Sequence, residues 1–437
     1  MTIDTPRTDA PPSRPVRAPS AALPSLIRRN TLLLTMAQAF IGMGNQAIPT
    51  LVPLITVQML GSAALAGLGT ALLSVSRLIV AYPVGYLSDR YGRRAGMLLG
   101  LTLTMTGAVV AGTSMVVGSF ALLVFGIIVF GMGVGAGQQL RLAAADMFLP
   151  ARRAEGLGYV LTGSLVGAIA APLLFIGGQA LEGPLGMSAL TTVWFLMPLV
   201  VLPGMALVIA VRPDPKTIAQ NLGLYYPGYV APAASSVAVA TGGGVKVWLR
   251  HYPLATAYGI NFAAQGVMAM MMAMTSLALS HHGHPLALIS VSVSIHVVGM
   301  FGLSIPIGRF SDRFGRRPTM LLGCAILAIG SLLVPTSSAY AIVTFGTFLV
   351  GVGWSCCTVA SSALITEVVP PAERGRAIGV SDSFAQFASM VMPLAGGPLV
   401  VLAGLPALAI FALAVLVLPA VLVLRLREPR PGTYAYP

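Results

Sequence analysis

Long apolar segments recur along nearly the whole of this chain, and they are the feature that most limits its possible folds. Each predicted span is at least 18 residues long, which is enough for a helix to cross about 30 Å of hydrocarbon. Only 8% of the 437 residues are charged, whereas soluble domains carry roughly 25%. Because lipid offers the backbone no hydrogen-bond partners, such segments fold as helices. The sequence therefore predicts an all-α membrane protein, since the short alternating segments of a membrane β-barrel are absent.

Twelve spans are predicted from these segments, six in each half of the chain. They are 31–53, 64–87, 95–116, 119–145, 158–180 and 189–211, followed by 252–279, 287–310, 319–336, 340–366, 378–402 and 405–425. The spans define two six-helix bundles, at 31–211 and 252–425. The segment 212–251 is predicted to be a cytoplasmic linker, 1–30 a disordered cytoplasmic tail, and 426–437 a second cytoplasmic tail.

The distribution of lysine and arginine predicts the orientation of the spans. None of the 25 Lys and Arg residues lies in a connection that follows an odd-numbered span, whereas five lie in the N-terminal tail. Cytoplasmic connections are rich in these residues, so both termini are predicted to lie in the cytoplasm and the protein in the inner membrane. The same scattered charges account for the net charge of +13 without a nucleic-acid partner.

Two short motifs occur in both halves of the chain. The ten residues that begin at Gly85 return at Gly308 with the shared pattern Gly-x-x-x-Asp-Arg-x-Gly-Arg-Arg, at an offset of 223 residues. A second pair begins at Pro150 and Pro371, at an offset of 221 residues. Matches at nearly one offset and in the same topological positions predict the duplication of a six-helix unit.

This loop pattern resembles the signature of the major facilitator superfamily, and the resemblance extends over residues 31–425. It implies that the two halves rock about a site near the membrane midplane and so give alternating access. It also implies two cytoplasmic charge clusters with a gating role, namely Asp89, Arg93 and Asp146, and their counterparts Asp312, Arg316 and Glu367.

Two arginines, Arg77 and Arg141, lie inside predicted spans. For Arg141 we favour a salt bridge to Asp146 or extension of the side chain to the membrane surface. The acidic residues lie in loops or at the membrane border, and none is predicted near the midplane, where proton-coupled carriers often have one.

Methionine and histidine occur at similar depths on the seventh and eighth spans. Met268 and Met272 are four residues apart, as are His296 and Met300, so each pair shares one face of its helix. At 1.5 Å per residue these side chains lie ~12 to ~21 Å from the outer ends of their spans. Thioether sulfur prefers Cu(I), and imidazole also binds copper. The pattern predicts a central copper site, with possible outer capture of the metal by His281, His282 and His284.

The same four residues resemble a pattern of bacterial copper importers within this superfamily, Met-x-x-x-Met on span 7 and His-x-x-x-Met on span 8. That resemblance implies import of copper for the assembly of the haem–copper site of cytochrome oxidase. Relatives with similar motifs carry riboflavin, so a carrier of an organic solute (riboflavin, a metabolite or a drug) is the alternative. Hydrogen-bonding groups for such a solute are present on Asn45, Gln46, Gln138, Gln139, Asn261 and Gln265.

Neither a nucleophile–base pair nor a catalytic motif is present, so we expect a transporter and not an enzyme. A membrane sensor without transport is a third alternative, although the linker is too short to be a signalling domain. Flexible packing is the competing explanation for the methionine run. We expect a monomer in the lipid bilayer that has a small substrate and no permanently bound cofactor, with copper only as cargo. The three cysteines fall in predicted spans, so no disulfide framework is expected.

Overall fold

The structure is a computed structural model, and it describes residues 23–137, 139–149, 152–227, 229, 249–369 and 373–427. Within these ranges the chain forms helices and short connections, and no strand is present. Much of the predicted linker, most of the predicted N-terminal tail and nearly all of the predicted C-terminal tail lie outside the described residues.

The first half of the chain forms a bundle with six segments that are long and apolar enough to cross a membrane. The fourth of these consists of α4 and α5, and the fifth of α6 and α7. The helices are α1 (Ser25–Leu60), η1 (Ala63–Leu65), α2 (Leu68–Tyr91), α3 (Arg93–Val117), α4 (Phe120–Ala136), α5 (Gln139–Asp146), α6 (Arg153–Ala170), α7 (Pro172–Leu185) and α8 (Ala189–Ala210).

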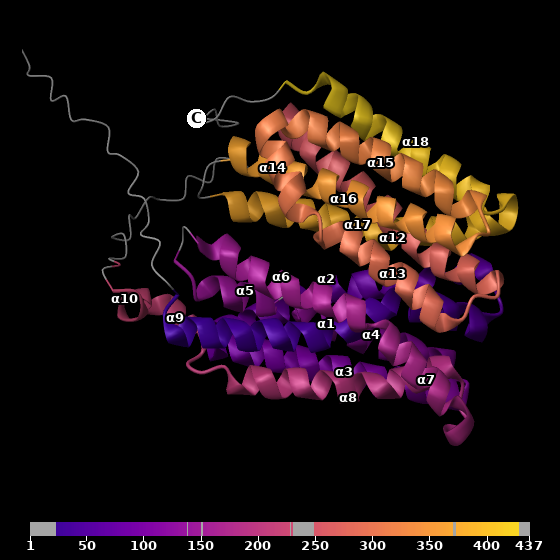
Figure 1. Cartoon of the computed structure of the whole chain (residues 1–437), viewed down its shortest axis with the longest axis horizontal. Helices are drawn as coiled ribbons and strands as arrows, with labels where there is room; N and C mark the ends of the chain where they lie inside the picture. Colours follow the sequence, from indigo (N-terminus) through magenta and orange to yellow (C-terminus); the bar gives the residue numbers. More distant parts are fainter. Residues whose placement is uncertain are drawn as a thin grey trace, which may run out of the picture.

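The second half forms a matching bundle with six further membrane-length segments. Figure 1 shows the two bundles side by side, with the first half in indigo to magenta and the second in orange to yellow. The prediction of an all-α protein with twelve spans is confirmed. The helices are α12 (Tyr252–His281), α13 (Leu286–Phe301), α14 (Ser304–Phe314), α15 (Arg316–Thr336), α16 (Tyr340–Val368), α17 (Arg374–Ala403) and α18 (Pro406–Arg425).

The first helix is longer than its predicted span at both ends. It begins at Ser25, inside the segment predicted as a tail, and it continues to Leu60 instead of residue 53. Gly61 ends the helix in the left-handed conformation with φ of 66°, and its N–H donates to the Val57 carbonyl over 2.8 Å. Hydropathy locates the part of a helix that lies in hydrocarbon, whereas capping residues fix where the helix ends.

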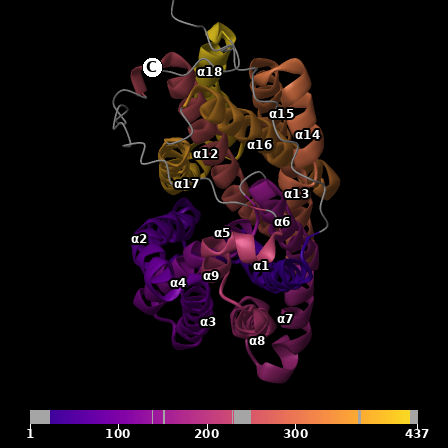
Figure 2. The same cartoon turned by 90° about the vertical axis from the view of Figure 1, so that its left-hand side faces the viewer.

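The predicted linker is partly helical and packs against the first half. It contains α9 (Pro215–Gln220) and α10 (Leu222–Tyr225). Ile218, Leu222 and Tyr226 are buried in one hydrophobic cluster with residues of the first bundle. This part of the connection therefore belongs structurally to the first half, as Figure 2 shows for α9 beside α5 and α1.

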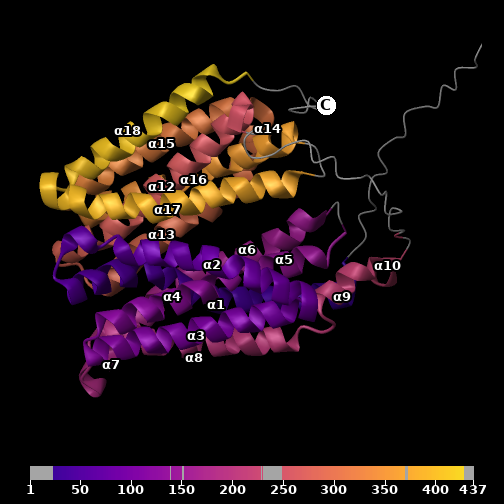
Figure 3. The ribbon, with the colours of Figure 1, turned by 180° about the vertical axis from the view of Figure 1, so that it is seen from behind.

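The chain enters α1 and leaves α18 at the same end of the molecule, on the left in Figure 1 and on the right in Figure 3. We call this the terminal end, and we call the opposite end, where α12 turns into α13, the distal end. Odd-numbered spans run from the terminal to the distal end, and even-numbered spans run back.

The seam between the halves is close-packed near the distal end. There α2 and η1 pack against α17, α1 packs against α12 and α13, and α6 and α7 pack against α13. A Cβ atom at Gly67 would collide with the Pro393 carbonyl, and one at Gly397 would collide with the backbone of Ala64. Glycine is therefore required at two points where backbone of one half meets backbone of the other.

Two serines of the second half donate hydrogen bonds to backbone carbonyls of the first half. The Ser276 hydroxyl donates to the Pro49 carbonyl over 2.9 Å, and the Ser294 hydroxyl donates to the Ala168 carbonyl over 2.6 Å. In each case the residue four positions after the acceptor is a proline, Pro53 or Pro172. Because proline has no N–H, it leaves that helical carbonyl without its usual donor. The serines supply the missing donors and join the halves at the distal side.

We expect Ser276→Ala and Ser294→Ala each to loosen the distal side. Ser276→Ala removes the donor that replaces the N–H missing at Pro53, and an unsatisfied buried carbonyl costs about 1–3 kcal/mol. Ser294→Ala leaves the Ala168 carbonyl only the longer bond of 3.3 Å from the Ala171 N–H. Leu54 is buried near this seam, so a cysteine introduced there reports on its opening. In the purified serine variants, this cysteine should react with maleimide several-fold faster than in the Leu54→Cys protein that keeps both serines. The native cysteines are buried.

Ser292→Ala is the matched control. Ser292 lies on α13, as Ser294 does, but its hydroxyl pairs with Thr347 within the second half. Equal labelling rates in all four proteins would show that the two serines do not hold the seam.

Candidate functional site

One face of α12 carries polar and thioether side chains along most of its length. Asn261, Gln265, Met268 and Met272 follow one another at intervals of three or four residues, which places them on one face of the helix. Ser276 continues this face and contacts α1 of the other half. The face therefore begins inside the second bundle and reaches the seam between the halves. We call it the α12 stripe.

The two amides of the α12 stripe are held in place by neighbouring helices. Asn261 donates to the Ser381 hydroxyl over 2.9 Å and accepts from the Thr358 hydroxyl over 3.3 Å. Gln265 donates to the Ser389 hydroxyl over 3.0 Å and accepts from the Trp354 indole N–H over 2.7 Å. These contacts fix the two amides against α16 and α17. Fixed polar groups of this kind orient a ligand at low entropic cost.

Aromatic side chains lie beside this polar network. The rings of Trp354 and Phe301 meet edge to face with centroids 6.0 Å apart. Nearer the terminal end, Tyr258 and Phe384 line a pocket of about 250 Å³ together with Leu249 and Phe262. Both Gln265 and Trp354 are half-buried, so each keeps accessible surface.

His296 lies on the face of α13 that packs against α16. It is 2% exposed, and its Nδ1 is 2.7 Å from the Thr347 carbonyl. A carbonyl only accepts, so Nδ1 carries the proton and Nε2 keeps a lone pair. Nε2 is buried and has no hydrogen-bond partner among the described residues. It is therefore the ring nitrogen available to a ligand.

The three methionines of the predicted copper site differ in burial. Met272 is 5% exposed, whereas Met268 and Met300 are half-buried. A Cβ atom at Gly351 of α16 would meet the backbone of both His296 and Met300. The predicted ligands thus come from two helices that both pack against α16. Their assembly around a metal stays a prediction.

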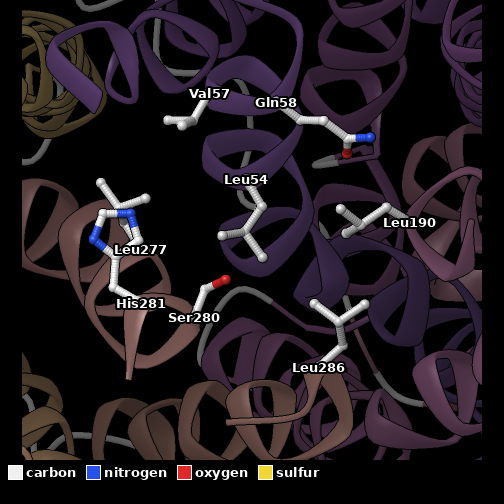
Figure 4. A pocket seen from close by; sticks show the side chains of 8 residues that line it. All are labelled: Leu54, Val57, Gln58, Leu190, Leu277, Ser280, His281 and Leu286. Atoms are coloured by element: carbon white, nitrogen blue, oxygen red, sulfur yellow. The ribbon is translucent and has the colours of Figure 1, made fainter. Parts of the chain in front are cut away.

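The three histidines of the predicted outer capture site lie at the distal end, where α12 turns into α13. His281 lines a pocket of about 220 Å³ between the halves, which Figure 4 shows with Leu54, Val57 and Gln58 on the α1 side. His282 is exposed, and the ring of His284 lies 5.4 Å from that of Tyr340. In the described part of the chain, no group of three or more His, Cys, Asp or Glu side chains is arranged to hold a metal. Outer capture of a metal stays a prediction.

The two predicted charge clusters are present at the terminal end. Arg93 pairs with Asp89 over 3.2 Å and with Asp146 over 2.7 Å. Arg316 pairs with Asp312 over 2.7 Å and with Glu367 over 2.6 Å. Each of the four ion pairs lies within one half. The pairs Arg93–Asp146 and Arg316–Glu367 join the loop after the second span of each half to the end of its fourth span. Their gating role stays a prediction.

The ion pair between Arg141 and Asp146 that the sequence suggested is not formed among the described residues. The Asp146 carboxylate pairs with Arg93, which the sequence analysis had placed in the same charge cluster. Arg141 is left without this partner.

Asp214 is a residue that the sequence analysis missed. Its carboxylate accepts hydrogen bonds from the backbone N–H groups of Arg93 and Arg94, both over 3.0 Å, at the first turn of α3. It also accepts from the Lys216 N–H and so caps α9. The Lys216 ammonium donates to the Asp89 carbonyl. The linker is thereby attached to the loop that carries the first charge cluster. Aspartate directly before Pro215 is a helix-start signal that could have indicated a cap.

The remaining predicted polar residues lie in the first half. The side-chain oxygens of Asn45 and Gln139 are buried and have no hydrogen-bond partner among the described residues. Gln46 is half-buried, and Gln138 lies outside the described residues. Asn45 and Gln139 therefore keep hydrogen-bonding capacity that the protein does not use itself.

Comparison with known proteins identifies similar chains. The family model of the Major Facilitator Superfamily matches residues 34–224 and 254–435. The chain is 28% identical over 371 residues to the uncharacterized MFS-type transporter YdeG of Bacillus subtilis (strain 168), and the matched region covers 82% of each protein. It is 25% identical over 372 residues to the riboflavin transporter RfnT of Brucella anthropi, covering 81% of this chain and 85% of that protein.

Among solved structures, the fold is similar to that of a bacterial homologue of the human lysosomal transporter Spinster in an inward-facing and occupied conformation. The TM-score is 0.66 at 14% sequence identity, over 90% of this chain and 95% of that chain. The similarity shows a shared fold.

We expect Asp89→Asn and Asp312→Asn to lower transport without loss of stability or affinity. Both carboxylates are largely exposed, 75% and 73%, and exposed ion pairs contribute about 0–1 kcal/mol to stability. Uptake of labelled riboflavin and of radioactive copper should be measured beside the thermal unfolding of each purified variant. Glu182→Gln, in an exposed position at the distal end, is the control. A parallel loss of substrate binding would instead assign the two aspartates to the substrate site.

Proposed function

Because the chain belongs to the Major Facilitator Superfamily, we propose that it is a secondary transporter that carries an organic solute across a bacterial inner membrane by alternating access. The observation that carries this proposal is the α12 stripe. Its amides, Asn261 and Gln265, are positioned by side chains of α16 and α17 beside the half-buried indole of Trp354.

The composition of this region favours an organic ligand. Binding sites for small molecules combine apolar and aromatic walls with a few fixed polar groups. Trp354 offers a ring surface, and the amides offer donors and acceptors at defined positions. The unpartnered Nε2 of His296 adds a buried acceptor. The similarity to a riboflavin transporter over most of both chains supports the same substrate class.

The arrangement of the halves supports alternating access. The distal end is closed by the two serine hydrogen bonds and by the glycine contacts between α17 and the segment from η1 to α2. The ion pairs of the terminal end lie within the halves. We propose that the terminal end faces the cytoplasm, as the distribution of Lys and Arg predicts. The structure then corresponds to a state closed to the outside.

Copper import is the second candidate, and a specific observation favours it. Metal-binding histidines usually donate their other ring N–H to a carbonyl or carboxylate, which fixes the ring and its tautomer. His296 has this arrangement, with Nδ1 on the Thr347 carbonyl and Nε2 free. With the thioethers of Met268, Met272 and Met300 it provides a soft, neutral ligand set that suits Cu(I).

A ligand screen separates the two candidates. The purified protein should be heated with a panel of vitamins, nucleosides, amino acids and carboxylates, and separately with Cu(I). We expect at least one organic solute to stabilise the wild type, by about 2.7 kcal/mol at a hundredfold excess over Kd. The effect should be lost in Gln265→Ala, because the fixed amide next to Trp354 is removed.

Gln220→Ala, in an exposed position on α9, is the matched control and should behave as the wild type. Growth of a riboflavin auxotroph on limiting vitamin tests one member of the panel directly. Copper import would replace the proposal if three results were found together. Cells with the wild type would take up more radioactive copper than cells with the empty vector, His296→Ala and Met272→Ala would each abolish this uptake, and no organic solute would stabilise the protein.

Topology can be tested independently of substrate. Reporter fusions at residues 220 and 283 should report opposite sides of the membrane, since the first lies at the terminal end and the second at the distal end. An alkaline phosphatase fusion should be active only at residue 283. Activity at residue 220 alone would invert the orientation, and activity of both would contradict the twelve-span arrangement.

A further inference from the structure

Two positive charges inside the first bundle have no acidic partner among the residues that the structure describes. Arg77 lies in α2 and Arg141 in α5, and both side chains are half-buried. Neither forms an ion pair in the described part of the chain. The acid nearest to Arg141 in sequence is Asp146, and its carboxylate is occupied by Arg93.

Both arginines lie within membrane-length segments of the first half. At 1.5 Å per residue, Arg77 lies ~21 Å and Arg141 ~8 Å from the terminal ends of their spans.

The surroundings of Arg77 show that its position is built into the packing. A Cβ atom at Gly135 of α4 would meet the Arg77 Cα at 3.1 Å and its Cγ at 3.3 Å. The side-chain stem thus rests on a glycine of the neighbouring span, which holds the residue along the junction of α2 and α4. Its Nε is buried without a hydrogen-bond partner.

Arg77 and Arg141 both carry a positive charge and lie on membrane-length segments of one bundle. Like charges in a medium of low dielectric constant repel strongly. Ionisable groups inside a membrane bundle normally pair with each other or face a pathway and mark where a substrate passes. Two cations cannot form an ion pair with each other, so the missing partner is an anion. The guanidinium fork binds carboxylate and phosphate oxygens well.

We propose that Arg77 and Arg141 bind the carboxylate or phosphate group of the transported solute, and that the substrate is therefore an organic anion. This inference rests on the proposed function and narrows its substrate class. The anionic group belongs to the first half, whereas the aromatic and amide groups of Trp354 and Gln265 belong to the second. A solute held by both halves stabilises the arrangement in which they meet, and so its binding is coupled to the rocking of the bundles.

The test uses pairs of probes that differ only in charge. Full-length protein in lipid nanodiscs should be titrated, at fixed ionic strength, with flavin mononucleotide against riboflavin and with benzoate against benzamide, and binding measured from thermal unfolding. In the wild type, the anionic member of at least one pair should bind about tenfold more tightly than its neutral partner. The pair that responds distinguishes phosphate from carboxylate.

Arg77→Gln and Arg141→Gln should abolish this preference for the anion. Arg141→Lys should keep part of it, because the charge is retained. Arg29→Gln is the control, since Arg29 is exposed at the terminal end of α1. Without ligand, each Arg→Gln change should raise the Tm, because it removes repulsion between unpaired cations. A structural ion pair would give the opposite sign.

Three results would overturn the inference: equal binding of charged and neutral probes, an anion preference that survives both Arg→Gln changes, or no stabilisation by any anion. A neutral solute that binds the wild type and is lost in Gln265→Ala would overturn the anion inference alone and leave the proposed function intact. Failure of every solute, charged or neutral, would count against both.

Discussion

The two halves meet through carbonyl groups that lose their usual helical donor to proline. In hydrocarbon an unsatisfied carbonyl costs several kcal/mol. Pro53 removes the usual donor of the Pro49 carbonyl, and Pro172 leaves the Ala168 carbonyl a bond of 3.3 Å from the Ala171 N–H. Ser276 and Ser294 of the second half donate to these two carbonyls. The prolines therefore do more than bend α1 and separate α6 from α7. They determine where the second bundle sits against the first, and with it which faces of α12 and α13 border the seam.

The candidate site follows from that placement. Ser276 anchors the distal end of α12 on α1, and the other residues of the α12 stripe precede it on the same face of that helix. Within the second bundle, side chains of α16 and α17 hold Asn261 and Gln265 in place. In the described part of the first bundle, the two arginines Arg77 and Arg141 form no ion pair. The second half thus offers neutral, directional groups, and the first half offers charge.

The sequence predicted the number of spans and the duplication because hydrophobic length and a repeated loop are local properties. It predicted the two charge clusters residue by residue, and the ion pairs of Arg93 and Arg316 agree with it. It also offered Arg141 as a partner of Asp146, because both arginines are compatible with the sequence. The packing of α3 against α5 places Arg93 there instead. Asp214 was missed because its partners are backbone N–H groups far away in sequence. Helix geometry predicted that His296 and Met300 share one face, but the orientation of His296 towards Thr347 depends on how α13 packs against α16.

When a serine hydrogen bond between the halves breaks, the hydroxyl and the carbonyl are affected differently. Each hydroxyl has a second acceptor in its own helix, since Ser276 also lies 3.4 Å from the Met272 carbonyl and Ser294 lies 2.9 Å from the Ser290 carbonyl. The Pro49 carbonyl has no such local substitute, because Pro53 removes the donor within its helix. Separation of the halves at the distal end therefore leaves each serine an acceptor in its own helix, whereas the Pro49 carbonyl loses its donor. The Ala168 carbonyl keeps a longer bond of 3.3 Å from the Ala171 N–H, so a water molecule that enters at the distal end is needed most at Pro49.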